Sequence, residues 1–326
     1  MVAVHSTARG PSLGGCRMWT YDDAWEAAMD AVRLSRAMTF KSAVAGLPLG
    51  GGKGVVMLPA GSAPPQGDAR RAVLLDFADT VDALDGAYVT AEDVGTSEPD
   101  MRVIAEGTAH VSGLPDGSGD PSPWTALGVE AAIRVACEHA LGSDSLDGRT
   151  VAVVGLGHVG APLAELLAAG GARLVLADID PARRGLAERL GAEWTDPAGA
   201  LRAEVDVLAP CALGGVLDAA SVPELRCRAI AGAANNQLAH DGIAALLAAR
   251  GILWVPDFVA NGGGVINISV ELEPGGYSRE RADAKVRGVA DTVRTVLDHA
   301  DATGATPLAA ALEIAHRRVE EAAVTT

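Results

Sequence analysis

The sequence predicts an α/β protein with two domains, the second built on a Rossmann-type parallel sheet. Three observations support this fold class. The chain has 326 residues, which is more than one hydrophobic core usually takes. Helix-like and strand-like segments alternate through most of its length, as in α/β proteins. From residue 151 onward an apolar strand runs through a glycine-rich turn into a helix, as at the start of a doubly wound sheet.

Composition and charge exclude several classes of partner. Hydrophobic residues make up 49% of the chain and charged residues 21%, which is typical of a globular protein. The net charge is −16. We therefore expect neither nucleic acid nor an anionic membrane as a partner, because both require a basic face. No apolar run approaches the ~20 residues of a membrane span, and the N-terminal stretch lacks the pattern of a signal peptide.

The cysteines show no spacing that indicates a disulfide framework or a metal site. There are four, at Cys16, Cys137, Cys211 and Cys227. We therefore expect reduced thiols in a cytoplasmic protein, with no bound metal.

The first half of the chain is expected to alternate strands and helices. Asp23 followed by Glu26 resembles a capping box, which predicts a helix that continues to about Met38. The periodicity of residues 68–84 predicts a second helix. The predicted strands of this half are 2–6, 42–47, 54–58 and, running into a loop, 87–95.

A loop rich in Gly, Asp, Ser and Pro, residues 113–123, marks the expected domain boundary. Ser122 then caps a helix that has Pro123 at its first position and Gly142 after its end. Strands and helices alternate beyond it, and the final 50 or so residues, 277–326, are predicted to be helical. The expected domains are 1–122 together with about 305–326, and 123–304.

The strongest single motif is the glycine-rich turn Gly155-Leu156-Gly157-His158-Val159-Gly160. It lies between a strand and a helix, and the next strand ends in Asp178, near the spacing of an acid that binds ribose. The first two glycines let the backbone approach a pyrophosphate, and the third lets helix pack on strand. The helix N-terminus then presents its N–H groups to the phosphates.

Asp178 is expected to bind the ribose hydroxyls and to repel a 2′-phosphate, so the sequence predicts NAD rather than NADP. Asp180 competes for this role, but its position favours the following turn. His158 is expected to make a local contact and not to act as a catalyst. The cofactor-binding residues expected from this motif are Gly155, Gly157, His158, Val159, Gly160 and Asp178.

The stretch "LPLGGGKGVVM", residues 47–57, has the composition of a phosphate-binding loop. Its spacing excludes a P-loop, because Leu47 stands where a glycine is required and Gly54 where Ser or Thr is required. The strand also follows the glycines instead of preceding them. A turn with a solvated lysine is one alternative. The other is that the glycines clear space for a ligand beside Lys53.

Seven motifs occur along the chain in a fixed order. They are "GPSLGGCRMW", "MTFKSAVAGLPLGGGKGVV", "TAEDVGT", "VVGLGHVG", "PCALGGVL", "AGAANNQ" and "PDFVANGGGVINI". Together they resemble the glutamate/leucine/phenylalanine/valine dehydrogenase family, over about residues 3 to 320. The resemblance implies reversible oxidative deamination of an L-amino acid to a 2-oxo acid and ammonia with NAD. It also implies an N-terminal substrate-binding and oligomerisation domain, an NAD domain, and an active-site cleft between them.

The resemblance assigns roles to individual residues. Lys41 resembles the lysine that binds the substrate carboxylate, Lys53 the general acid/base, and Asp93 the aspartate that assists proton transfer at the amino group. A lysine base must be neutral at the working pH, although its reference pKa is ~10.4. Burial and a nearby cation, such as Lys41 or the oxidised nicotinamide, both lower that pKa. Further residues implied are Gly14, Gly15 and Asn261 at the substrate, and Thr125 and Asn236 near the nicotinamide.

The residue before Gly14 bears on substrate choice. Glutamate-specific members of the family place a lysine there, whereas this chain has Leu13. Burying a carboxylate beside Leu13 without a partner is costly, so we expect a hydrophobic substrate. The expected apolar wall is Leu13, Ala91, Val265 and Ile268. One methylene contributes only ~1–3 kcal/mol to such selectivity, so leucine, valine, phenylalanine and tryptophan-type substrates all stay open.

Two further questions stay open at this stage. The family usually has a helix and an edge strand before the segment that matches "VAVHS", and these take part in oligomer contacts. We expect a homo-oligomer, but its size and the physiological direction of the reaction are not predicted. A non-catalytic NAD-binding protein of the same fold is the alternative function, and the presence of Lys41, Lys53 and Asp93 argues against it.

Overall fold

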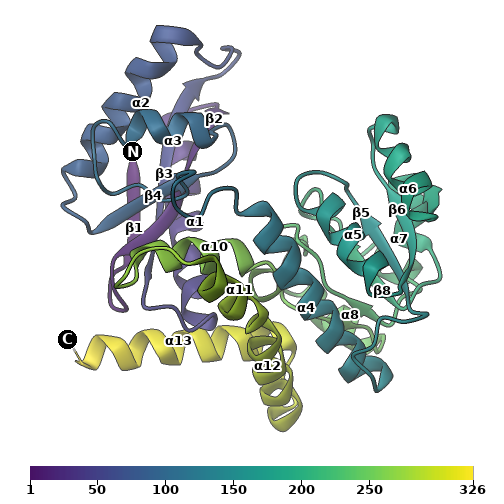
Figure 1. Cartoon of the computed structure of the whole chain (residues 1–326). Coiled ribbons are helices and arrows are strands. Elements are labelled where there is room, and N and C mark those ends of the chain that lie inside the picture. Colours follow the sequence, from purple (N-terminus) through teal and green to yellow (C-terminus); the bar gives the residue numbers. More distant parts are fainter. Residues whose placement is uncertain (326) are drawn as a thin grey trace. The chain divides into compact units, whose positions relative to one another are not determined.

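The computed structural model describes residues 1–325 and divides them into two compact units (Figure 1). The first contains residues 1–121, 265–282 and the chain from 314 onward, and the second contains 122–264 and 283–313. The first division therefore lies at the loop expected to be the boundary. Two details differ from the expected ranges: residues 265–282 belong to the first unit, and the last segment of that unit starts at 314 and not at about 305.

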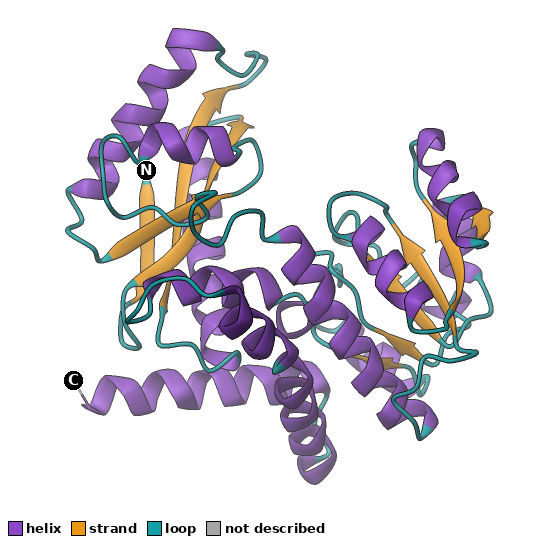
Figure 2. Cartoon of the chain, in the orientation of Figure 1, coloured by secondary structure: helices purple, strands orange, loops and turns teal. Residues whose placement is uncertain are grey.

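A four-stranded mixed sheet forms the centre of the first unit (Figure 2). Its order is β1-β3-β2-β4, and β2 runs parallel to both of its neighbours while β1 is an antiparallel edge strand. The bounds are β1 Val2–Ser6, β2 Ser12–Tyr21, β3 Gly50–Pro59 and β4 Tyr88–Glu92. The strands predicted at 2–6 and 87–95 are confirmed. The central strand β2 was not expected from any alternating pattern.

Helices cover both faces of this sheet. Helix α1, Ala24–Val44, packs Ala27 and Ala31 against Val55 of β3. The opposite face, with Cys16 of β2, is covered by α2, Gly67–Asp82, and α3, Glu98–Ile104. A further helix, α10, Gly263–Ser269, lies mostly in the first unit and is followed by the 3₁₀ turn η3, Val270–Leu272.

The strand predicted at 42–47 is wrong. Helix α1 continues to Val44, well past Met38, and a turn follows it. The buried residues Ser35, Thr39 and Ser42 keep the three- and four-residue spacing of a helix. Strand β3 starts earlier than expected, since it includes the glycines before Lys53.

The second unit contains a six-stranded, fully parallel sheet with the order β10-β9-β8-β5-β6-β7. This is the strand order of a doubly wound dinucleotide-binding fold, whose switch point lies between the first and fourth strands, here β5 and β8. The predicted Rossmann sheet is therefore confirmed. The bounds are β5 Thr150–Val154, β6 Arg173–Ala177, β7 Glu193–Thr195, β8 Val207–Pro210, β9 Ala229–Ile230 and β10 Leu253–Trp254.

Helices connect and flank these strands, and the last part of the chain is helical as expected. None of the helices in residues 1–325 is long and apolar enough to cross a membrane. The bounds are α4 Ser122–Leu141, α5 Gly160–Ala169, α6 Arg184–Leu190, α7 Pro197–Arg202, α8 Ile243–Ala249, α9 Asp257–Ala260, α11 Arg279–Arg287, α12 Val289–Thr303 and α13 Pro307–Thr325, with short 3₁₀ turns at η1 Pro181–Arg183 and η2 Val222–Glu224.

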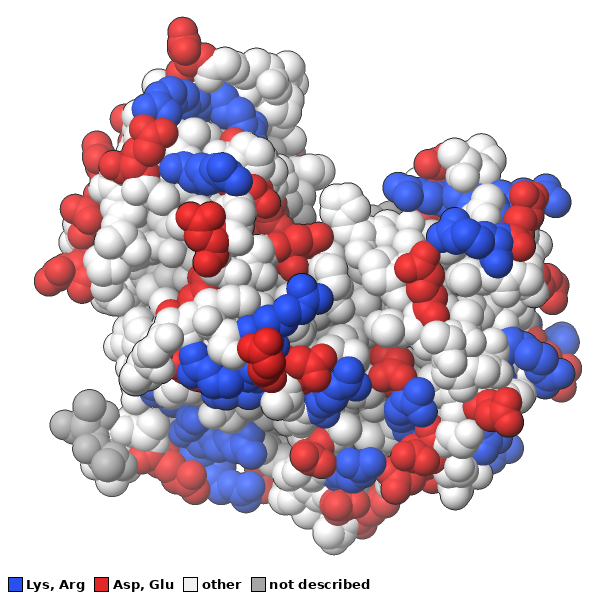
Figure 3. All heavy atoms as spheres, in the orientation of Figure 1, with Lys and Arg blue, Asp and Glu red and all other residues white. Residues whose placement is uncertain are grey.

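The surface carries charges of both signs. Acidic and basic side chains are interspersed on the face that Figure 3 presents. Many of them pair locally, such as Arg71 with Glu106 in the first unit and Arg294 with Glu138 in the second. Such exposed pairs contribute little to stability, but in each of them an acidic side chain balances the charge of a basic one.

Candidate active site

The candidate catalytic residues of the first unit lie on one face of its sheet. The register pairs Leu13 with Gly51 and Gly15 with Ala91. Because side chains two residues apart share a face, Gly15, Lys53 and Ala91 form one row across β2, β3 and β4. The next row along holds Arg17 and the residue after β4, Asp93.

Lys53 and Asp93 form a buried ion pair on this face. Lys53 Nζ lies 2.8 Å from Asp93 Oδ2, and Lys53 is only 5% exposed. Burial lowers the pKa of Lys53, Asp93 opposes this shift, and the positive charge of Arg17 adds to it. Burial alone would raise the pKa of Asp93, but Lys53 and Arg17 hold it below its ordinary value. The pair therefore combines a fixed carboxylate with a lysine that is easier to deprotonate than usual.

The loop that carries Asp93 is fastened to β2. The hydroxyl of Thr96 donates to the Cys16 carbonyl oxygen at 2.7 Å, and the same Oγ1 accepts the Asp93 N–H at 3.0 Å. This arrangement fixes the backbone of Asp93 relative to the strand that runs between it and Lys53.

The glycines around Lys53 pack against protein atoms. A Cβ on Gly51 would lie 2.1 Å from the backbone nitrogen of Thr39, and one on Gly52 would lie 2.5 Å from the Tyr88 ring. A Cβ on Gly14 would overlap the Gly52 carbonyl oxygen at 1.7 Å. The expectation that the glycines before Lys53 clear space for a ligand is therefore wrong, because α1 and β4 already fill that space.

The other substrate residues predicted for the first unit lie on four elements. Lys41 stands in the last turn of α1 and is half-buried. Leu13 on β2 and Ala91 on β4 are 1% and 3% exposed. Val265 and Ile268 on α10 are also buried. Their contact with a substrate stays a prediction.

The glycine-rich turn of the second unit has the geometry of a phosphate cradle. Gly155 has φ +100°, a backbone conformation that favours glycine, and a Cβ on Gly160 would lie 1.8 Å from the Gly155 carbonyl oxygen. A Cβ on Gly157 would meet open space, so a ligand can approach the backbone there. Helix α5 follows with no side chain capping its N-terminus. These residues fit the pyrophosphate of a dinucleotide.

Asp178 lies at the end of β6, beside this turn. Its Oδ2 accepts the Leu156 N–H at 2.6 Å and its Oδ1 accepts the Asp180 N–H at 2.8 Å. Asp180 instead caps η1 through the Ala182 N–H, as expected of the competing candidate. His158 is exposed, and Val159 is half-buried.

Asn261 follows α9, and its side chain is 5% exposed. Its Nδ2 donates to the Ala233 carbonyl oxygen at 3.0 Å and to Asn235 Oδ1 at 2.7 Å. Its Oδ1 is buried and has no hydrogen-bond partner within the described chain. A buried acceptor of this kind is costly to leave unpaired, so it is suited to a donor on a bound molecule.

Two family models match the chain. One, for the dimerisation domain of the Glu/Leu/Phe/Val dehydrogenases, matches residues 1–110, and the other, for the glutamate/leucine/phenylalanine/valine dehydrogenases, matches residues 176–326. A leucine dehydrogenase of Thermoactinomyces intermedius is 42% identical over 98% of this chain and 87% of its own. The chain belongs to the glutamate/leucine/phenylalanine/valine dehydrogenase family. It is an amino-acid dehydrogenase, as its motifs implied.

Two more relatives of this dehydrogenase are similar over nearly the whole chain. A valine dehydrogenase of Streptomyces coelicolor is 42% identical over 99% of this chain and 88% of its own. The crystal structure of L-tryptophan dehydrogenase from Nostoc punctiforme superposes with a TM-score of 0.85 at 36% identity. It covers 98% of this chain and 91% of that one. The relatives therefore differ in the amino acid they are named for.

Two residues of the dehydrogenase that contact the candidate site residues were not predicted from the sequence. Arg17 pairs with Asp93, and its place in the motif "GGCRMW" two residues after Gly15 was the available signal. Asn235 Oδ1 accepts a hydrogen bond from Asn261. The predicted Asn236 is the next residue; both asparagines are exposed, and Asn236 has φ +53°. Thr125, also predicted near the nicotinamide, lies half-buried in the first turn of α4.

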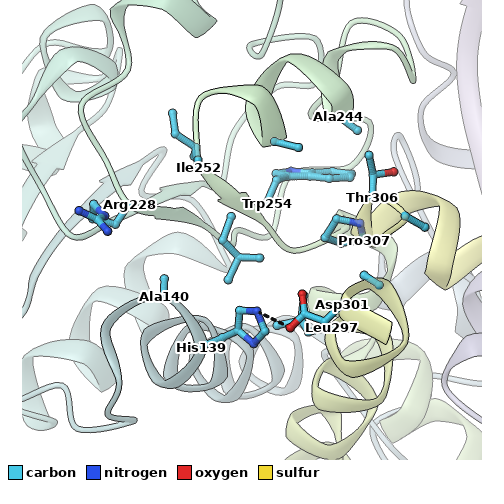
Figure 4. Close-up of a pocket in the computed structure, with 15 residues that line it drawn as sticks. His139, Ala140, Arg228, Ala244, Ile252, Trp254, Leu297, Asp301, Thr306 and Pro307 are labelled. Carbon is cyan, nitrogen blue, oxygen red and sulfur yellow. Dashed lines mark ion pairs between the residues drawn. The ribbon is translucent and has the colours of Figure 1, made fainter. Parts of the chain in front are cut away.

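A separate cavity of about 310 Å³ lies in the second unit of the dehydrogenase (Figure 4). Trp254, Leu297 and Pro307 line it, and at one wall His139 Nε2 lies 3.3 Å from Asp301 Oδ2. None of the glycines of the phosphate cradle lines this cavity, so it is distinct from the dinucleotide site.

Proposed function

We propose that this dehydrogenase catalyses the reversible, NAD-dependent oxidative deamination of a hydrophobic L-amino acid to its 2-oxo acid and ammonia. The observation that carries the proposal is the buried Lys53–Asp93 pair, 2.8 Å apart. A lysine with a lowered pKa beside a fixed carboxylate is suited to moving protons at a substrate nitrogen and at water.

The chemistry follows from these side chains. Lys41 holds the substrate carboxylate. A nicotinamide cofactor held at the turn from Gly155 to Gly160 and at Asp178 would supply the acceptor for a hydride from the α-carbon, and the substrate would then be an iminium. Lys53, as a neutral amine, takes a proton from the water that adds to this carbon. Asp93 assists the transfer of a proton to the nitrogen, after which the C–N bond breaks and ammonia leaves.

Asn261 is proposed to accept a hydrogen bond from the substrate amino group. Its buried Oδ1 lacks a partner within the described residues, while its Nδ2 is held by Ala233 and Asn235. The amide is therefore fixed with its acceptor available. We assign Thr125 and Asn236 to the nicotinamide, and Gly14 and Gly15 to backbone contacts with the substrate, from their motifs.

NAD is proposed over NADP because of Asp178. Two backbone N–H groups hold its carboxylate beside the phosphate cradle. A carboxylate accepts about four hydrogen bonds, so positions stay for the ribose hydroxyls. The negative charge of a 2′-phosphate is repelled at the same place. Gly155, Gly157, His158, Val159 and Gly160 are the proposed backbone cradle.

The substrate side chain is proposed to pack on Leu13, Ala91, Val265 and Ile268, all of which are buried and apolar.

A homo-oligomer is also proposed. The dimerisation-domain match supports it, as does an apolar stripe on α1, where Trp25, Met29 and Val32 are 73%, 46% and 50% exposed. A cytoplasmic location is proposed because all four cysteines are unpaired.

A substrate panel tests the proposal. Purified protein is given ammonia and a series of aliphatic, aromatic and acidic 2-oxo acids, with either NADH or NADPH, and loss of the reduced cofactor is followed by absorbance. We expect turnover with NADH and a hydrophobic acid, and little with 2-oxoglutarate or NADPH. NAD binding without turnover on any acid would instead support a non-catalytic NAD-binding protein.

A further inference from the structure

Arg17 and Lys53 share one oxygen of Asp93. Asp93 Oδ2 lies 2.8 Å from Lys53 Nζ and 2.9 Å from Arg17 Nε. The two cations approach from different strands, β3 and β2. Both side chains lie on the face of the sheet that α1 covers.

Arg17 is fixed from its other side by α1. Its Nη1 lies 3.0 Å from Asp30 Oδ2. Asp30 in turn accepts a hydrogen bond from the Tyr21 hydroxyl at 2.8 Å and pairs with Arg33 at 2.6 Å. The rigid guanidinium is therefore held between two carboxylates, and it does not depend on Lys53 for its position.

A lysine that must lose its proton beside a buried carboxylate faces a difficulty. If Lys53 were the sole cation at Asp93, its deprotonation would leave a buried carboxylate without a charge partner, which is strongly unfavourable. A guanidinium keeps its proton at all relevant pH values. Arg17 therefore stays paired with Asp93 whichever protonation state Lys53 adopts.

We propose that Arg17 is a positioning residue that keeps Asp93 paired and in place while Lys53 cycles between its charged and neutral forms. The catalytic part of this inference, that Lys53 changes its protonation state during turnover, rests on the proposed function. It predicts that loss of the Arg17 charge makes Lys53 harder to deprotonate, since Asp93 would then have Lys53 as its remaining close cation.

The surroundings of Lys53 are consistent with this role. The positive charge of Arg17 acts to lower the pKa of Lys53 and that of Asp93. Burial raises the pKa of the Cys16 thiol to about 12, so Cys16 stays neutral. Besides Arg17, Lys53 and Asp93, the titratable or charged groups that act on this cluster are Cys16 and Tyr21 on β2, Asp30 and Arg33 on α1, Tyr88 on β4, and the N-terminal amine and Asp100.

The chain allows a direct measurement, because it contains only three lysines, Lys41, Lys53 and Lys285. Protein labelled with ¹³C at lysine Cε gives one NMR signal for each, and the shift of each signal with pH reports the protonation of that amine. The Lys53 signal is assigned by its loss in Lys53→Met, and exposed Lys285 is an internal reference. This readout does not require turnover.

The variants are Arg17→Met, which removes the charge, and Arg17→Lys, which keeps it. The matched control is Arg71→Met, which removes an arginine from the exposed pair with Glu106. We expect Arg17→Met to raise the Lys53 midpoint by about one pH unit, which is about tenfold in proton affinity. The acid limb of kcat/KM for deamination should move by the same amount. Arg17→Lys should bring the Lys53 midpoint back close to its wild-type value.

Different results would overturn the proposed role of Arg17 and the proposed function. Unchanged Lys53 midpoints in both Arg17 variants, as in Arg71→Met, would overturn the role of Arg17 even if the enzyme is active. Absence of wild-type turnover on every 2-oxo acid would overturn the proposed function, while the NMR titration still reads the effect of Arg17. If Arg17→Met does not fold, Arg17→Gln decides, because it also removes the charge but can still donate a hydrogen bond to Asp93. An unchanged Lys53 midpoint in Arg17→Gln would overturn the proposal.

Discussion

Lys53 and Asp93 make their 2.8 Å contact across an intervening strand. Lys53 is on β3 and Asp93 follows β4, and β2 runs between these two strands. The residue of β2 that lies beside Lys53 is Gly15. A Cβ there would lie 2.7 Å from Asp93 Cβ and 2.6 Å from the Glu92 carbonyl oxygen. The missing side chain of Gly15 is therefore what allows the two groups to meet.

Gly15→Ala is expected to separate Lys53 from Asp93. The new methyl group clashes with backbone at Glu92, so β4 and the loop after it must shift. Because general acid–base catalysis contributes typically ~10²–10⁴-fold, we expect kcat to fall by about 10²-fold or more. NAD affinity should stay unchanged, since the phosphate cradle lies in the other unit. Steady-state kinetics and NAD titration by calorimetry measure both.

Gly185→Ala is the matched control for this change. Gly185 lies in α6, and a Cβ there meets no atom within 4 Å. Replacing a helical glycine by alanine stabilises a helix by ~0.5–1 kcal/mol, so activity should be unchanged and Tm should rise slightly. Wild-type kcat in Gly15→Ala would show that Lys53 and Asp93 need not meet across β2.

Lys53→Ala is expected to abolish turnover while NAD binding survives. The variant has no base to take the proton of the attacking water, and a loss of about 10³-fold or more in kcat is expected. Because the pKa of Lys53 is lowered, wild-type deamination should rise with pH through a midpoint below the ~10.4 of a free lysine. Lys285→Ala, at an exposed position, should keep wild-type activity. Retained activity in Lys53→Ala would remove Lys53 from the mechanism.

The second unit was the more predictable part from sequence. Its phosphate turn and acidic residue carry a local pattern, Gly155 to Gly160 with Asp178, and local backbone geometry dictates that pattern. The first unit depends on contacts between distant segments. Its central strand β2 is buried on both faces near its start, so it lacks the alternation that indicates a strand.

The same reason explains the site residues that were missed. Arg17 gains its role from Asp93, which lies 76 residues away in the chain, and no spacing rule connects them. Asn235 and Asn236 are adjacent and chemically identical, so the sequence alone does not tell which of them contacts Asn261; in the fold Asn235 does. The glycines before Lys53 led us to expect space for a ligand. That space is filled by the Tyr88 ring and by α1, which come from other parts of the chain.

Leu13→Lys is expected to shift the substrate preference toward glutamate. Leu13 is 1% exposed, so a lysine there is desolvated unless an acidic side chain pairs with it. A hydrogen bond to a charged group contributes ~1.5–3 kcal/mol, which corresponds to about 10- to 100-fold in kcat/KM. The ratio of kcat/KM for 2-oxoglutarate to that for the best hydrophobic 2-oxo acid should rise by this factor.

Leu13→Met separates the effect of charge from that of shape. It conserves volume and polarity, and such core changes usually cost less than ~1.5 kcal/mol, so the hydrophobic preference should persist. Leu13→Lys should also lower Tm, because without a bound diacid the ammonium is buried without a partner. Binding of 2-oxoglutarate should restore part of that loss through linkage. One outcome would contradict this assignment: Leu13→Lys still rejects acidic substrates, and its kcat/KM for hydrophobic substrates equals that of the wild type. In that case Leu13 does not face the substrate, and the specificity of this dehydrogenase depends on other residues.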